Sequence, residues 1–364
     1  MSFCQTAFAA AALSLAALVS TGSAGAADLP VTASDQPLKA KAPPPDLPFF
    51  LLIDDRVTFA YMPTATFAGD YSRNPDGSID GKTAKQVYAF THFDVWAYGT
   101  NFFNISMYKM DHNTPANPCT NAGVIYSTPA TCAGATQVWG ILRSTYGWNE
   151  IFNTKAFSAG PLHNISFEIG GEASASDDFN AQAKRAYVAG LQFAFDLPYK
   201  GFFNVAPMVY KETNHSAWYQ CGLFGPGVPG VTCIADGNTD FNTTWTVETN
   251  YYMDLGFLPE NLRFWSISGR AAWIGPKGNQ AAPLTTGAAT VVNLDSEPIR
   301  LTFDAGKAIW GPKLSHFVDV WVAYRYVQNK SGYDHATSSL CVVNGVSNNT
   351  CTESTLYTGV TVKF

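Results

Sequence analysis

The sequence is short of charge and of long apolar runs. Charged residues make up 14% of its 364 residues, whereas an ordinary globular protein carries about 25%. Beyond the N-terminus it has no run of about 18 apolar residues, the length that a membrane-spanning helix needs. The mean hydropathy is −0.03 and aromatic residues make up 14%. This combination excludes a helical membrane protein. It fits a β-barrel, in which an apolar outer face and a polar inner face together give a mean hydropathy near zero. A neutral secreted β-sandwich is the other class that remains open.

The motifs of common metal and hydrolase sites are also missing. There is no CxxC spacing and no histidine beside a cysteine pair, which argues against a metal site. There is no G-x-S-x-G, and His163 and Ser166 fall on opposite faces of one expected strand. The segment from Asp76 to Gly81 begins like a calcium loop, but Val87 stands where the chelating carboxylate is due. We therefore expect no enzyme activity, no metal and no cofactor. The net charge of −6 argues against a nucleic-acid partner.

The N-terminal region predicts export. An apolar run from Phe8 to Val19 precedes Ala24-Gly-Ala26, an A-x-A site that predicts a signal peptide over residues 1–26, although no Lys or Arg precedes the run. Residues 27–53 contain six prolines and predict a disordered or polyproline-like periplasmic leader. The barrel is expected over residues 54–364.

The rest of the chain alternates strand-like segments with turns. The last of them, Thr355 to Phe364, places Leu356, Val360 and Phe364 on one face and polar residues on the other. This period-two pattern is typical of a strand. Twelve such segments are predicted as strands: 55–67, 84–97, 101–112, 136–148, 162–175, 184–197, 201–213, 241–253, 262–275, 297–308, 316–329 and 354–364.

The connections between these strands have two lengths. Those after odd-numbered strands are mostly long, whereas those after even-numbered strands include short turns at residues 98–100 and 198–200. Long outside loops and short periplasmic turns are typical of bacterial barrels. The sequence therefore predicts an all-β, transmembrane antiparallel β-barrel of about 12 strands in the bacterial outer membrane, with both termini periplasmic. A sandwich would bury its apolar faces instead, but the lack of edge-strand protection favours closure.

The six cysteines that follow the signal peptide fall into three local pairs. Each pair lies in a connection after an odd-numbered strand, on the expected outside. An even count in an exported chain predicts disulfides, and six cysteines permit 15 connectivities. Pairing within each loop is the simplest of them: Cys119–Cys132, Cys221–Cys233 and Cys341–Cys351.

Charged residues gather on one face of the predicted strands, opposite the apolar face. Because charge on a lipid-facing surface costs about 2–4 kcal/mol near the midplane, the charged face is expected to line the lumen. The candidates for contact with a solute there are His92, Asp94, Arg143, Glu168, Glu248, Asn250, Arg270, Arg300, Asp304, Asp319, Trp321 and Arg325. They have two interpretations: ligands of a solute, or ion pairs that brace the barrel across the lumen.

Three stretches resemble the Tsx-like nucleoside-specific channel family of outer-membrane proteins. They are Phe93 to Phe103, Asp196 to Asn204 with Tyr210-Lys-Glu212, and Asp304 to Trp310 followed by Tyr324-Arg-Tyr326. Thr100 stands where the family usually has an acidic residue. The resemblance implies a narrow twelve-stranded barrel that conducts nucleosides.

The functional prediction follows from these observations together. We expect a monomer, embedded in outer-membrane lipid, that lets small polar solutes diffuse passively through a narrow lumen, with nucleosides favoured. The alternatives are a small-solute porin of other specificity, and a surface barrel whose disulfide-stapled loops bind a partner.

Overall fold

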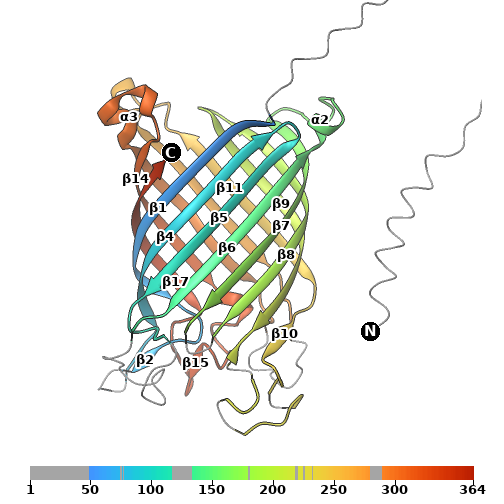
Figure 1. Cartoon of the computed structure of the whole chain (residues 1–364), viewed down its shortest axis with the longest axis vertical. Coiled ribbons are helices and arrows are strands. Elements are labelled where there is room, and N and C mark those ends of the chain that lie inside the picture. Colours follow the sequence, from blue (N-terminus) through green and yellow to red (C-terminus); the bar gives the residue numbers. More distant parts are fainter. Residues whose placement is uncertain are drawn as a thin grey trace, which may run out of the picture. The chain divides into compact units, whose positions relative to one another are not determined.

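A single closed barrel dominates the computed structural model (Figure 1). The structure describes residues 49–73, 76, 78–116, 133–178, 181–217, 220–223, 226–231, 233–278 and 289–364. The predicted signal peptide and most of the predicted leader lie outside this part of the chain, and so does the pair Cys119–Cys132.

Twelve long strands form the wall and pair antiparallel in chain order. Their bounds are β1 Phe50–Thr66, β4 Lys82–Trp96, β5 Gly99–Met110, β6 Thr136–Gly147, β7 Leu162–Ser176, β8 Ala183–Leu197, β9 Gly201–His215, β11 Thr244–Asp254, β12 Trp265–Ile274, β13 Asn293–Asp304, β14 Val318–Gln328 and β17 Thr352–Lys363. The last strand pairs back to the first, with Arg56 opposite Lys363 and Tyr61 opposite Thr358. This closure leaves no long strand with a free edge, and it confirms the predicted twelve-stranded antiparallel barrel.

The two ends of the barrel differ in their connections (Figure 1). The end that carries the C-terminus, called the C-terminal end below, holds the short helices α2 (Trp148–Ile151) and α3 (Ala305–Trp310) and the 3-10 turns η3 (Glu260–Leu262) and η5 (Pro312–Leu314). The opposite end, called the loop end, carries the longer connections. These contain β2 (Ser72–Arg73), β3 (Ile79–Asp80), β10 (Asn238–Asp240), β15 (Val342–Val343), β16 (Val346–Ser347) and the 3-10 turn η6 (Lys330–Gly332). Among the helices in the described ranges, none has the length and apolar character needed to cross a membrane.

Two strand bounds differ from the sequence prediction. Strand β1 begins at Phe50, so residues 50–53 belong to the barrel wall and not to the leader. Residues 305–308 were predicted as strand but form α3, because the Asp304 side chain caps the helix by accepting a hydrogen bond from the Lys307 amide at 2.7 Å. The other strands match their predicted ranges to within a few residues.

Alternation along the strands sorts side chains into an outer and an inner set. In β8, Tyr187 is 62% exposed, whereas its neighbour Ala186 is 1% exposed. In β17, Leu356 is 64% exposed beside Thr355 at 2%. Large apolar residues therefore cover the outside, while polar residues, small residues and a few buried aromatic side chains fill the inside. This is the arrangement of a transmembrane barrel with lipid around it.

Candidate functional site in the barrel lumen

Strand register places most of the predicted lumen residues on the inner face. Since paired residues share a face, each strand can be assigned from exposed apolar neighbours such as Val57, Phe59 and Leu142. By this test the inner face carries Arg143, Glu168, Glu248, Asn250, Arg270, Arg300, Asp304, Asp319, Trp321 and Arg325.

The prediction that His92 and Asp94 face the lumen is wrong. The register of β1 and β4 runs without a shift from the Val57–Phe90 pair to the Asp55–His92 pair. Val57 is 45% exposed on the outer face, so His92 and Asp94 lie on that face too. The sequence of β4 misled the assignment because apolar residues occupy both of its faces.

An ion pair crosses the lumen from β6 to β11. Arg143 contacts Glu248 through Nη2–Oε1 at 2.6 Å and Nε–Oε2 at 3.0 Å. These strands are separated around the wall by β7, β8 and β9, so the contact passes through the interior. Arg143 also pairs with Glu172 at 2.8 Å, and Lys184 pairs with the other oxygen of that carboxylate at 2.7 Å. Arg143, Glu172, Lys184 and Glu248 therefore form a network of ion pairs that extends into the lumen.

The opposite wall carries an arginine stacked on an aromatic ring. The Arg300 guanidinium lies 4.0 Å from the centroid of the Trp321 ring and pairs with Glu297 at 2.7 Å. The Trp321 indole N–H donates to Thr361 at 3.0 Å, and the Tyr357 hydroxyl donates to Glu297. Because Arg300 covers one face of Trp321 and the indole is 3% exposed, Trp321 offers little surface for stacking a solute.

Towards the loop end, one carboxylate gathers several donors. Glu353 is 2% exposed and lies 2.8 Å from both Arg325 Nε and Lys330 Nζ. It also accepts the Thr66 amide at 2.8 Å, and Arg325 reaches Asp295 at 2.8 Å. Burial lowers the pKa of the Lys330 ammonium. The neighbouring Glu353 carboxylate opposes this effect and stabilises the charged form of Lys330. This cluster joins η6, β1, β13, β14 and β17.

A second buried pair joins β9 to the connection after β12. Lys277 lies 2.6 Å from Glu212, with side chains 4% and 2% exposed. The Tyr210 hydroxyl donates to Glu212 at 2.5 Å, and the Lys277 ammonium sits 4.5 Å from the centroid of the Phe241 ring. Together with the Glu353 cluster, it anchors loops to the barrel wall.

Two predicted residues remain open to water within the lumen. Arg270 and Asn250 face inward and are both exposed. Arg270 forms no ion pair with a residue in the described ranges, whereas Asn250 accepts a hydrogen bond from Asn204 at 3.0 Å. These two side chains are therefore open to the lumen.

The inner face at the C-terminal end combines aromatic and ionic groups. Phe202 stacks on Tyr252, with ring centroids 6.2 Å apart. The Tyr252 hydroxyl lies 3.4 Å from His316 Nε2, and His316 Nδ1 lies 3.0 Å from Asp319. The hydrogen bond to Asp319 raises the pKa of His316.

His316 and two carboxylates lie close enough to suggest a cation site. The ligand atoms of Asp304, His316 and Asp319 lie within 4.8 Å of one another. However, the Asp304 oxygens accept hydrogen bonds from the backbone N–H groups of Lys307 and His316 and from the Ser315 hydroxyl. Capping of α3 accounts for that carboxylate, so we assign no metal to this cluster.

Loops from different sides of the barrel meet over the mouth at the loop end. Ala68, Tyr333, Leu340, Cys341 and Cys351 form a buried apolar cluster, called the mouth cap below. Ile234, from the connection between β9 and β11, packs against it. Gln182, from the connection between β7 and β8, donates to the Ala68 carbonyl at 3.2 Å. The connections after β1, β7, β9 and β14 are not all neighbours around the wall, so contacts between them extend across the mouth of the barrel.

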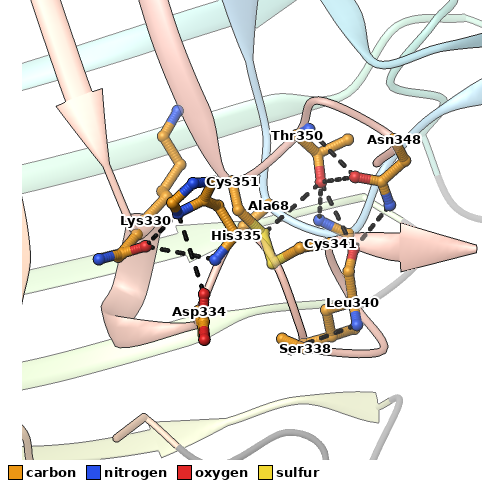
Figure 2. Close-up of a disulfide and its surroundings, with 12 residues drawn as sticks. Ala68, Lys330, Asp334, His335, Ser338, Leu340, Cys341, Asn348, Thr350 and Cys351 are labelled. Atoms are coloured by element: carbon orange, nitrogen blue, oxygen red, sulfur yellow. Dashed lines mark hydrogen bonds and ion pairs between the residues drawn. A yellow bond between two sulfur atoms is a disulfide. The ribbon is translucent and has the colours of Figure 1, made fainter. Parts of the chain in front are cut away.

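A disulfide holds the mouth cap together (Figure 2). Cys341 and Cys351 are bonded, as are Cys221 and Cys233, which confirms two predicted pairs. Inside the first of these loops, Asn348 donates to the Leu340 carbonyl at 2.7 Å. Thr350 accepts the Gly69 amide at 3.0 Å, which ties the stapled loop to the connection after β1.

Sequence reasoning missed several inward charged residues. Glu172, Glu212 and Glu353 obey the alternation of their strands, so the period-two test would have found them. Lys85 lies on β4 opposite Met62, and the error that placed His92 inside would have placed Lys85 outside. Glu297 is different, because an irregularity between Ser296 and Ile299 breaks the alternation of β13. Pro298 lies within that irregularity, and a proline inside a strand is a sign of a bulge, so the sequence did carry a signal for it.

No protein-family model matches the sequence, and no curated protein matches it. Solved structures similar to the chain include an outer membrane channel from Pseudomonas putida F1, at a TM-score of 0.43 and 10% identity, covering 89% of this chain and 100% of that one. The beta domain of the Bordetella autotransporter BrkA aligns at 0.35 and 8% identity, covering 86% and 98%. A BenF-like porin from Pseudomonas fluorescens Pf-5 aligns at 0.24 and 8% identity, covering 87% and 99%. Similarities at this level carry no conclusion about the function of the chain.

Proposed function

We propose that the protein is a passive channel of the bacterial outer membrane for small polar solutes, with nucleosides favoured. The observation that supports this most strongly is the Arg143–Glu248 pair, which spans the interior of a barrel with an apolar exterior. A closed wall with a polar, charged interior provides a path for polar solutes, and the pair lies across that path. The proposed role requires neither a cofactor nor a catalytic step.

The preference for nucleosides rests on chemistry available inside the lumen and on the family resemblance. A base needs an aromatic face, which the Phe202–Tyr252 stack at the C-terminal end supplies. Ribose hydroxyls need donors and acceptors, and Arg270 and Asn250 are exposed to the lumen. Weak contacts of this kind would slow a solute without trapping it.

We further propose that the C-terminal end faces the periplasm and that the protein acts as a monomer. Short connections at one end and long connections at the other suit this orientation, because bacterial barrels have short periplasmic turns and longer outside loops. Cleavage of the signal peptide before Ala27 belongs to the same proposal.

Recordings from purified protein in planar bilayers test the function. Small openings that micromolar adenosine or thymidine blocks would support it. Openings indifferent to every nucleoside would remove the preference and leave a porin of other specificity. No openings at all, together with tight binding of a surface partner that requires the disulfide loops, would replace the channel by the surface-barrel alternative.

A further inference from the structure

A chain of polar side chains lies on the lipid-facing side of the barrel, where charge is costly. His92 bridges two carboxylates, with Nδ1 2.7 Å from Asp55 and Nε2 3.1 Å from Asp94. The Asn101 amide donates to Asp94 at 2.9 Å, and the Ser144 hydroxyl donates to Asn101. All five residues face outward by the register of β1, β4, β5 and β6. The cross-lumen ion pairs do not use them.

The depth of this polar chain matches the level of lipid headgroups. Trp96 stacks on Phe49 and contacts Tyr98 and Tyr146, with ring centroids 5.4–5.9 Å apart. Aromatic girdles of this kind sit at membrane interfaces. Since Asp94 lies only two residues from Trp96, the carboxylates fall just inside the girdle, where the cost of a charge is about 0–1 kcal/mol.

An apolar groove continues from the polar chain towards the middle of the membrane. It has a volume of about 620 Å³ and lies over the same four strands, β1, β4, β5 and β6, together with β17. Its walls include Val57, Phe90, Ile105, Met107 and Val362. Its far row, at Tyr88, is four residues from His92, or about 13 Å along the strand. One leaflet contributes about half of the 30 Å hydrocarbon core, so the distance from the polar chain to the far end of the groove is close to the depth of one leaflet.

The charge of the polar chain selects the headgroup. Two carboxylates share one imidazole, so even a protonated His92 leaves a net negative charge. The Asp55 side chain keeps 27% of its surface exposed, which leaves an oxygen open to a further donor. A primary ammonium donates up to three hydrogen bonds, whereas an anionic glycerol headgroup would meet like charge.

We propose that this surface is a binding site for one phosphatidylethanolamine molecule. Its ammonium binds Asp55, whose negative charge is reinforced by the buried Asp94 on the other side of His92, and one acyl chain fills the groove over β1, β4, β5, β6 and β17. The site belongs to the outer wall and does not depend on the transport function.

Native mass spectrometry of the purified full chain in detergent tests this proposal. Palmitoyl-oleoyl phosphatidylethanolamine and palmitoyl-oleoyl phosphatidylglycerol are added in equal amounts, and retained adducts are counted as collision energy rises. The ethanolamine lipid is expected to give one adduct that survives longest. Equal retention of the two lipids would overturn the proposal, and so would dimers that exclude lipid from this face.

Variants locate the adduct. Asp55→Asn combined with Asp94→Asn should reduce retention of the ethanolamine lipid about tenfold, the size expected for loss of one charged hydrogen bond. The matched control is Asp196→Asn, which alters another carboxylate paired with a histidine at the C-terminal end. An unchanged adduct in the double variant would overturn the proposal.

A groove-filling variant keeps the test decisive if the double variant fails to fold. Val57→Trp fills the groove with an apolar side chain and should also displace the adduct. Val209→Trp is its control, because Val209 is an exposed outer residue on β9 away from the groove. Heat-dependent migration on gels reports folding of every variant. Retention that survives Val57→Trp would contradict the assignment of the acyl chain to the groove.

Discussion

The two ends of the barrel are held together by different forces. At the C-terminal end, His163 pairs with Asp196 at 3.2 Å, but these side chains are 61% and 68% exposed. At the loop end, Glu353 is 2% exposed and gathers Arg325 and Lys330 around it. Exposed pairs contribute little because water screens them, whereas breaking a buried pair leaves an uncompensated charge. Of these two pairings, the one around Glu353 beneath the mouth cap is therefore expected to contribute more to stability.

The largest expected effect follows from Glu353→Gln. The change keeps the size of the side chain but removes the charge opposite Arg325 and Lys330, so we expect the free energy of unfolding to fall by about 3 kcal/mol. Urea unfolding in detergent micelles, followed by tryptophan fluorescence, measures it. Asp196→Asn at the other end should change the same quantity by less than about 0.5 kcal/mol. Equal losses of unfolding free energy in the two variants would contradict the claim that the buried ion pairs contribute more than the exposed pair.

A smaller and more local effect is expected from Cys341→Ser with Cys351→Ser. Loss of this staple should destabilise the mouth cap by about 2 kcal/mol, while the strands below it stay paired. Hydrogen exchange should therefore rise in residues 333–350 and not in β14 or β17. Cys221→Ser with Cys233→Ser is the matched control, since neither of those sulfurs belongs to the mouth cap. Unfolding of the whole barrel on reduction would contradict a loop-local role.

The smallest effect concerns pH at the C-terminal end. The hydrogen bond to Asp319 raises the pKa of His316 above its ordinary value of 6.5. Its stabilising contribution is then complete below that value and is lost as pH rises through the raised pKa. Unfolding free energy should fall by less than about 1 kcal/mol across that range. His316→Gln should flatten this dependence, and a slope that persists in the variant would assign it to another group.

The sequence allowed prediction of the parts of the fold that depend on alternation. Twelve strands, their connections and two described disulfides follow from period-two patterns and from cysteines that are close in the chain. The prediction that His92 and Asp94 face the lumen was wrong because β4 carries apolar residues on both faces. Only the pairing of β4 with β1 determines which face points outward. The partner of Arg143 was also out of reach, since Glu248 lies 105 residues away and meets it only because the barrel closes. Contacts across a lumen depend on the closed wall and leave no periodic trace in the chain.

The central claim is that solutes pass through the lumen at the Arg143–Glu248 pair. Single-channel recording in planar bilayers of Glu248→Ala, beside wild type and Val247→Ala, tests it most directly. Glu248→Ala removes the carboxylate on β11 that pairs with Arg143 across the lumen, while Arg143 keeps its pair with Glu172. Single-channel conductance should rise because the ion pair no longer crosses the lumen. The current should become more anion-selective because a negative charge is lost. Val247 is the next residue on β11 and faces outward, so its variant should conduct like wild type. Identical conductance and ion selectivity in all three proteins would contradict a path through this part of the barrel.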